Sequence, residues 1–453
     1  MKKYEPIAMP FGEAIQKGLG RAFIQVRDSG AQGLKEDILN ACLQDLAYDA
    51  QCDNSRAEWL LAIADLTGEP EFYHDRILAA LPDVTEEEEL WDANQLVELA
   101  AILAQRGSER ARQAVYRKFD LQEFDASWLG AEQIIEIDGI KGLLHIAEIL
   151  GAKLLREPEH WEGANLVSEA SELYGKEAVV AALSERAEIS ANVRAYIDEI
   201  TKRSDFFEPN KSKKKKSSRQ TDRDRPTVEY IISKIEAGAN WRYYGGVLGQ
   251  RASDGEIEYL FERLLAETRR EQLLRYLWLF RKREFPRLDD RLFELAASDD
   301  EEIQHAAIVG LAHTKDTSIR NLANRLLREK PRSICHRALK LYNKNYEPED
   351  CQLIESVLTL WEDSDWLHDI AFDLIHFIKA QEDPQLANLL FWAYERTPCA
   401  ICRQYVVEDL LKRKQAPETL LQECFWDGDK EIRALAKSAL PDSIGLDSGI
   451  LSY

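Results

Sequence analysis

Apolar side chains recur along this chain at the spacing of one face of an α-helix. The clearest stretch is residues 299–327, which carries such a stripe twice, starting at Ile303 and at Ile319. Side chains at offsets 0, 3, 4, 7 and 8 lie on one side of a helix. Asp300 and Asp316 stand three residues before the two starts, where a carboxylate can cap the first free backbone N–H groups. The pattern predicts two short helices that are neighbours in a stack.

The same stripe returns before and after the middle of the chain, always with alanine at offset 4. A small side chain at this place allows a neighbouring helix to approach closely. The eight copies start at Leu60, Leu96, Leu143, Leu166, Ile303, Ile319, Leu367 and Ile432. The alternation that is typical of strands is nearly absent. We therefore predict an all-α fold.

Proline marks the start of helix pairs in the second half of the chain. Each of Pro286, Pro384 and Pro417 begins a short helical pattern, and a turn and a second helical pattern follow it. Proline is tolerated at a helix start because the N–H that it lacks would be unpaired there. These pairs indicate helical hairpins.

Charge is distributed unevenly and marks a domain boundary. Residues 1–208 carry 21 basic and 40 acidic side chains, whereas residues 209–226 carry 8 and 2 and contain no aliphatic or aromatic residue. Such a segment cannot bury apolar surface, and its lysines repel one another. We predict an acidic helical-repeat domain at 1–208, a disordered Lys-rich linker at 209–226 and a second helical-repeat domain at 227–453.

Length and composition exclude some classes of protein. The chain has 453 residues, of which 45% are hydrophobic, but no run of 18 uncharged apolar residues, so we expect no membrane span. Met1 is followed by basic residues without the apolar stretch of a signal peptide, which favours the cytoplasm. Seven cysteines, an odd number on a long chain, indicate free thiols rather than a disulfide framework.

The second half of the chain is similar to a known family. Asp429, followed by the pair Ile432-Arg433, resembles the second helix of a HEAT repeat, and residues 316–327 show the same arrangement. The resemblance covers about residues 286–440. It implies an irregular, armadillo-like α-solenoid on both sides of the linker. It transfers no catalytic residue, because the family motif is a packing motif.

The chain departs from the family in spacing and in one residue. The stripes at Ile303 and Ile319 are 16 residues apart, whereas a full repeat is about 40–47 residues long. Gln304 stands where the family usually has arginine. We therefore predict that the two stripes belong to successive helices of the stack, not to two complete repeats.

One cysteine pair is a candidate for chemistry. Cys399 and Cys402 form a CxxC motif at a predicted helix start, behind a possible Thr397 cap and before Arg403. A helix N-terminus lowers a thiol pKa, so redox chemistry is physically possible. A metal site needs further ligands, which His336 or the His368-Asp369 pair would supply if the fold brought them close. Two packing thiols are the alternative that we favour, and we assign no metal ligand.

Two stretches offer candidate contacts to phosphate or to a partner. One is rich in glycine, aromatics and arginine, and the other is a local basic cluster at residues 269–283. Their candidate residues are Trp241, Arg242, Arg251, Arg275, Arg281, Lys282 and Arg283. The first stretch lacks a preceding strand and a Walker lysine, which excludes a P-loop. A loop that closes the solenoid and a solvated helix face are the alternatives.

The predicted function follows from the scaffold and its charge. We expect no catalytic residue and no cofactor, and we predict a non-enzymatic scaffold that presents concave helical surfaces to a protein partner. The acidic first half favours a basic partner. Association with nucleic acid is the alternative, although a net charge of −22 disfavours it. A HEAT-like chromophore lyase is a third possibility, by resemblance alone.

Overall fold

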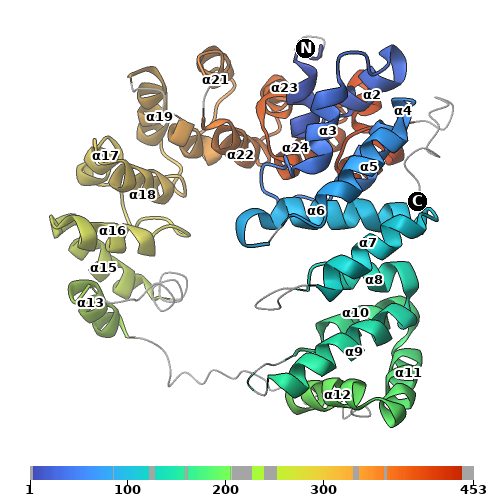
Figure 1. Ribbon diagram of the computed structural model, residues 1–453. Helices are drawn as coiled ribbons and strands as arrows, with labels where there is room; N and C mark the ends of the chain where they lie inside the picture. Colours follow the sequence, from blue (N-terminus) through green and yellow to red (C-terminus); the bar gives the residue numbers. More distant parts are fainter. Residues whose placement is uncertain are drawn as a thin grey trace. The chain divides into compact units, whose positions relative to one another are not determined.

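The computed structural model describes residues 4–84, 86–121, 128–157, 159, 162–204, 206, 227–238, 252–329, 336–361 and 365–440. The predicted linker at 209–226 lies outside these residues. Every regular element among them is helical (Figure 1), so the all-α prediction is confirmed. No helix in the described ranges is long and apolar enough to cross a membrane.

The described chain forms two compact units. The N-terminal unit comprises residues 9–206 and 423–433, and the C-terminal unit comprises residues 4–8, 227–422 and 434–440. Each unit is described by itself.

The N-terminal unit begins with twelve helices that follow one another along the chain. They are α1 (Phe11–Lys17), α2 (Gly20–Ser29), α3 (Lys35–Leu43), α4 (Ala57–Leu66), α5 (Pro70–Ala80), α6 (Glu86–Gln105), α7 (Glu109–Asp120), α8 (Ala131–Asp138), α9 (Ile140–Arg156), α10 (Asn165–Tyr174), α11 (Lys176–Ile189) and α12 (Ala191–Arg203).

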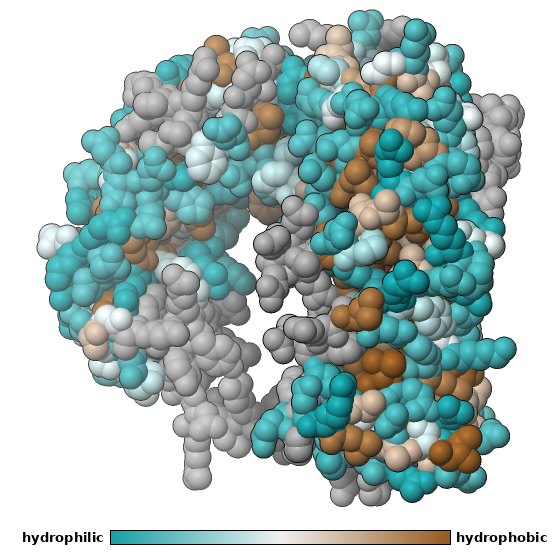
Figure 2. Space-filling view, viewed as in Figure 1, coloured by the Kyte–Doolittle hydropathy of each residue, from teal (hydrophilic) through white to brown (hydrophobic). Residues whose placement is uncertain are grey.

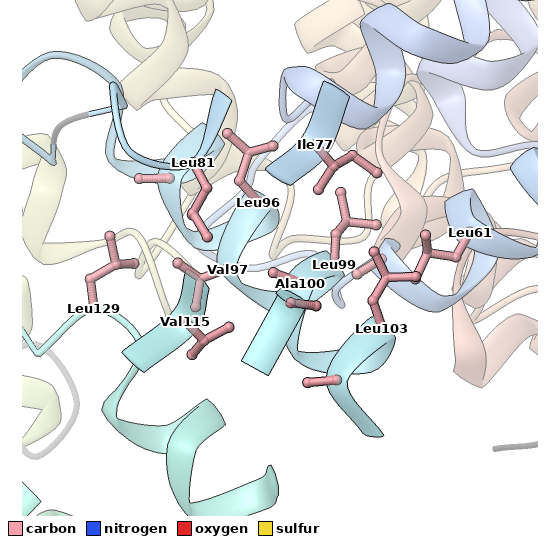
Figure 3. Packing of buried hydrophobic residues seen from close by; sticks show 14 of the residues in the cluster. Leu61, Ile77, Leu81, Leu96, Val97, Leu99, Ala100, Leu103, Val115 and Leu129 are labelled. Atoms are coloured by element: carbon pink, nitrogen blue, oxygen red, sulfur yellow. The ribbon is translucent and has the colours of Figure 1, made fainter. Parts of the chain in front are cut away.

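The core of this unit is built around α6. Its side chains Leu96, Val97, Leu99, Ala100 and Leu103 are buried and face α4, α5 and α7 (Figure 3). The prediction that the stripe starting at Leu96 is a core face is therefore confirmed. A glycine allows close approach of two helices elsewhere in the unit. A Cβ added to Gly151 on α9 would lie 1.9 Å from the backbone oxygen of Asn192.

Residues 423–433 pack within the N-terminal unit. The Trp426 ring stacks on Phe23 with 4.6 Å between ring centroids, and the Trp426 carbonyl accepts a hydrogen bond of 2.8 Å from Trp59 Nε1. The Gly428 amide donates to the Gly18 carbonyl at 2.7 Å. The predicted boundary at 209–226 assigns this segment to the second domain. A charge-based boundary carries no information about a segment that returns to the other unit.

The described part of the C-terminal unit is also built from helices that follow one another along the chain. They are α13 (Val228–Glu236), α15 (Asp254–Ala266), α16 (Arg270–Leu279), α17 (Asp290–Ala296), α18 (Glu301–Leu311), α19 (Thr317–Glu329), η2 (His336–Asn343), α21 (Asp350–Leu358), α22 (Leu367–Ile378), η3 (Pro384–Leu386), α23 (Ala387–Arg396) and α24 (Ala400–Lys412). Along the chain, α25 (Glu418–Cys424) and α26 (Lys430–Ala439) follow.

The two opening stripes form separate, successive helices, α18 and α19, as predicted. Asp300 caps α18, since its carboxylate accepts the amides of Glu302 and Ile303 at 3.1 and 3.2 Å. Asp316 accepts the amide of Ser318 at 2.8 Å at the start of α19. Both aspartate caps are therefore confirmed.

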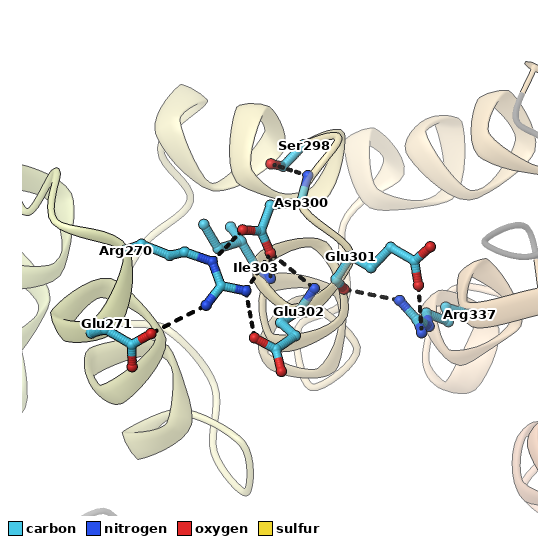
Figure 4. A network of polar contacts seen from close by, with 8 residues as sticks. All are labelled: Arg270, Glu271, Ser298, Asp300, Glu301, Glu302, Ile303 and Arg337. Atoms are coloured by element: carbon cyan, nitrogen blue, oxygen red, sulfur yellow. Dashed lines mark hydrogen bonds and ion pairs between the residues drawn. The ribbon is translucent and has the colours of Figure 1, made fainter.

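Arginines connect alternate helices of the C-terminal unit. Arg270 on α16 bonds Asp300 and Glu302 at the start of α18, and also its neighbour Glu271 (Figure 4). Arg320 on α19 bonds Asp350 at the start of α21, with 2.8 Å between Nε and Oδ2. Asp300 and Asp350 therefore have two functions: each stands at a helix N-terminus, and each holds an arginine of the helix that lies two elements earlier in the chain.

Candidate functional site

A groove in the N-terminal unit is lined by carboxylates and tryptophans. It encloses a cavity of about 380 Å³ between the loop of residues 45–56, α6 and α8. Its acidic and aromatic lining residues are Asp45, Asp53, Glu98, Glu132, Trp91 and Trp128. Arg56 is the one basic side chain among its described lining residues, and it is mostly buried. We call this site the acidic groove.

Helix α6 positions the loop that forms one wall of the acidic groove. Gln95 is buried, and its Nε2 donates to the carbonyls of Ala41, Cys42 and Gln44 at 2.9 to 3.2 Å. These contacts tie the end of α3 and the start of the loop to α6. The groove is therefore a built feature of the unit.

The carboxylates of the acidic groove are crowded. Burial, followed by the neighbouring charges of Glu136, Asp45 and Glu132, raises the pKa of Glu98. Burial also raises the pKa of Asp45. Beside the groove, burial and the charges of Glu132 and Glu136 raise the pKa of Glu169 to about 7. Each raised pKa means that the ionised carboxylate is poorly stabilised by its surroundings. A bound cation would stabilise it.

Hydrophobic side chains lie at the mouth of the acidic groove. Leu90 and Trp91 follow the acidic start of α6 and are 38% and 41% exposed. An aromatic face beside carboxylates suits a lysine or arginine, because the ring attracts the cation and the carboxylate pairs with it. Elsewhere in this unit, Leu155, Leu173 and Ile189 are exposed, and Figure 2 shows hydrophobic side chains among hydrophilic ones over α8 to α12.

A second cluster, in the C-terminal unit, joins the predicted cysteine pair to a histidine. Cys399 and Cys402 stand at the start of α24, and His368 stands at the start of α22. The Cys402 Sγ lies 3.7 Å from His368 Nδ1, and the ligand atoms of all three residues lie within 4.8 Å of one another. Both cysteines are buried, whereas His368 is partly exposed. We call this cluster the thiol–imidazole site.

Local hydrogen bonds set the two thiols apart. Cys399 itself caps α24, since its Sγ accepts the Cys402 amide at 3.5 Å, while Thr397 Oγ1 accepts the Cys399 amide at 3.3 Å. The predicted Thr397 cap therefore lies two residues too early. The hydrogen bond from the Cys402 thiol lowers the pKa of Cys399, and His368 contributes in the same direction. The same thiol pair raises the pKa of Cys402, with burial adding to the shift.

A pocket lies one helical turn beyond the thiol–imidazole site. It has a volume of about 270 Å³ between α22 and α24. Phe372 follows His368 by one turn of α22, and Tyr405 follows Cys402 by one turn of α24. Both aromatic side chains are partly exposed to the pocket mouth, with fractions of 41% and 43%.

The predicted basic cluster is largely engaged within the protein. The Arg269 guanidinium holds the pKa of Glu267 at about 2, and Arg270 bonds Asp300. Among the candidate contacts, Arg275 donates to the Gly238 carbonyl at 3.0 Å, and Arg281 lies 3.8 Å from the centre of the Trp278 ring.

Of the remaining candidate contacts, two lie in the described part of the chain and three lie outside it. Arg283 is partly buried and Lys282 is exposed. Trp241, Arg242 and Arg251 lie outside the described residues. A role of any of these residues in partner or phosphate binding stays a prediction.

The sequence reasoning identified the cysteine pair and named His368 as a conditional ligand, but it missed the acidic groove. The nearest signal was the spacing of four residues between Asp45, Asp49 and Asp53. That signal does not show that α6 carries Glu98 to the same place.

Comparisons with known proteins add little to these findings. No protein-family model matches the chain, and no curated protein matches it. The crystal structure of an engineered protein is similar over 95% of this chain and 98% of that chain, at 15% sequence identity and with a TM-score of 0.25. A likeness at this level carries no argument about fold or function.

Proposed function

We propose that this protein is a non-enzymatic scaffold whose acidic groove binds a basic segment of a partner protein. The observation that carries the proposal is the acidic groove itself, in which four carboxylates and two tryptophans surround one cavity. The raised pKa values of Asp45 and Glu98 support it. A lysine or arginine placed there would offset the burial and the neighbouring negative charge that raise these pKa values.

We further propose that the units are irregular HEAT-like α-solenoids. The Arg320 of the HEAT-like segment pairs with Asp350 of the next helix pair, as expected for a motif that links successive helices of a stack. Scaffolds of this kind bind partners along extended surfaces.

A nucleic-acid partner is the less favoured alternative. Duplex binding requires cations that are free to neutralise phosphates. In the predicted basic cluster, Arg269 and Arg270 already bond carboxylates of the same unit. The charge of the whole chain is −22, which repels a polyanion.

Titration of the full chain with a lysine- and arginine-rich peptide tests the proposal. Trp91 lies at the groove, so tryptophan fluorescence is a suitable readout. Calorimetry provides a second measurement of the affinity. We expect Glu98→Gln and Asp45→Asn each to weaken binding about tenfold, because one charge-assisted contact contributes about 1.5 kcal/mol. Binding should also weaken with salt.

Glu185→Gln is the matched control, because Glu185 is an exposed carboxylate on α11 of the same unit. The lysines of residues 211–216 could themselves compete with the peptide for the acidic groove. A variant in which serine replaces these lysines excludes that competition. Equal affinity in Glu98→Gln and in Glu185→Gln would refute a role of the groove. Salt-sensitive retention of the full chain on duplex DNA would favour the nucleic-acid alternative.

A further inference from the structure

The thiol–imidazole site supports an inference that is independent of partner binding. We infer that His368, Cys399 and Cys402 bind one Zn²⁺ ion through three protein ligands, with the fourth coordination position open to a small oxygen- or nitrogen-donor ligand. The three side chains come from the starts of two helices in one unit, and His368 precedes the two cysteines by 31 and 34 residues.

The distances between the ligand atoms fit a tetrahedral ion. With Zn–S of about 2.3 Å and Zn–N of about 2.0–2.1 Å, tetrahedral geometry separates sulfur from nitrogen by about 3.5 Å and sulfur from sulfur by about 3.8 Å. The Cys402 Sγ lies 3.7 Å from His368 Nδ1, and no pair of ligand atoms exceeds 4.8 Å. The three ligand atoms therefore lie close enough together to share one ion.

The protein already provides an outer contact for a metal-bound sulfur at this place. The Cys402 amide donates to the Cys399 Sγ, which is the kind of contact that orients such a sulfur. Zn²⁺ binds cysteine as the thiolate, so uptake of the ion should release protons to solvent.

The donor set selects the metal. Two thiolates and one imidazole are soft and intermediate ligands, which suit Zn²⁺ rather than Mg²⁺ or Ca²⁺. A structural zinc site is closed by four protein ligands, whereas a site with three keeps one position open. In the described ranges, His368, Cys399 and Cys402 form the one group of this kind.

The pocket on the same two helices offers room for the body of a fourth ligand. It begins one helical turn beyond His368 and Cys402, and its wall contains Phe372, Ile375 and Tyr405. Side chains of both charges also line it: Lys379, Lys412, Glu408 and Asp409. A small ligand with an apolar body and an oxygen or nitrogen donor fits this lining.

Metal analysis of the full chain, purified under reducing conditions and reloaded with Zn²⁺ or Co²⁺, tests the inference. We expect one equivalent of Zn²⁺ per chain. Co²⁺ should give a thiolate-to-metal charge-transfer band and the intense visible bands of tetrahedral coordination. Added imidazole or azide should shift the visible bands, because these probes enter the open position.

Variants locate the ion. Loss of an outer-shell contact weakens metal binding about 10- to 100-fold. Cys399→Ser, Cys402→Ser and His368→Asn should each weaken Zn²⁺ binding by more than that. Cys351→Ser is a matched control in the same unit, and it should leave binding unchanged. Circular dichroism of each variant separates loss of a ligand from loss of the fold.

Three outcomes would overturn the inference. The first is the absence of Zn²⁺ and Co²⁺ binding by a folded, reduced chain. The second is unchanged affinity in Cys399→Ser or His368→Asn. The third is a reduced chain that binds no metal and readily forms a Cys399–Cys402 disulfide on oxidation. That result would identify the cysteine pair as a redox dithiol. A Co²⁺ spectrum that is unaffected by imidazole and azide would overturn the open fourth position.

Discussion

The carboxylates at helix starts of the C-terminal unit and those around the acidic groove of the N-terminal unit behave in opposite ways. In the C-terminal unit they bond arginines at helix starts, and Arg269 holds the pKa of Glu267 at about 2. Around the acidic groove, burial and neighbouring carboxylates raise the pKa of Glu98 and, beside the groove, that of Glu169, which rises to about 7. The same residue type therefore stabilises helix starts in one unit and is kept at a cost around the groove of the other. A cost of this kind is expected where a charged surface has a binding function.

The largest expected effect tests an exception within the C-terminal unit. Asp373 is buried on α22 and bonds Lys340 of η2, and burial raises its pKa to about 6. Lys340→Met leaves this carboxylate without its cation and should destabilise the unit by about 3–5 kcal/mol. Native-state hydrogen exchange, read on peptides of α22 and η2, measures the change.

Adding Asp373→Asn to Lys340→Met is the control for this prediction. The double variant should recover part of the lost protection, because a buried amide costs less than an unpaired buried charge. An equal loss of protection in the single and double variants would show that Lys340 acts through packing instead.

A smaller effect is expected at a paired carboxylate. Glu267 accepts hydrogen bonds from the amides of Thr268 and Arg269 and from the Arg269 guanidinium. Glu267→Gln should cost about 1–2 kcal/mol at neutral pH. Because the folded pKa lies below the ordinary value of 4.5, this stability is complete above pH 4.5 and is lost as pH falls towards about 2.

Denaturant unfolding at several pH values measures this effect. The difference between the wild type and Glu267→Gln should narrow steadily below pH 4.5. Glu229→Gln, at an exposed position of α13, serves as the control with the same change of charge. A difference that stays constant down to pH 2 would contradict the role of ionised Glu267.

The smallest effect is expected beside the acidic groove, and its dependence on pH is opposite to that of Glu267. Glu169 has a folded pKa above its ordinary value, so the folded state binds more protons and its contribution to stability falls as pH rises from 4.5 to about 7. Glu169→Gln should therefore raise the melting temperature at pH 8 and change it little at pH 5. A destabilised variant at pH 8 would show that Glu169 is compensated, contrary to the comparison.

Local structure followed from the sequence to a large extent. The stripes at Ile303 and Ile319 form α18 and α19, and Asp300 and Asp316 cap them, because the spacing on a helix and the capping contacts involve residues that are close along the chain. The CxxC motif was also placed correctly at a helix start. These features depend on a few neighbouring residues, which the sequence states directly.

Only the tertiary structure decided which distant residues meet. It brought His368 to within 3.7 Å of Cys402, placed Asp45 and Glu98 around one cavity, and packed Trp426 on Phe23. Each of these contacts depends on how helices pack across long separations, and packing is set by the combined shape of many side chains. The sequence alone determined that the described chain is helical and where helices such as α18 and α19 begin. Packing determined which charges are paired, which are crowded, and where two thiols meet a histidine.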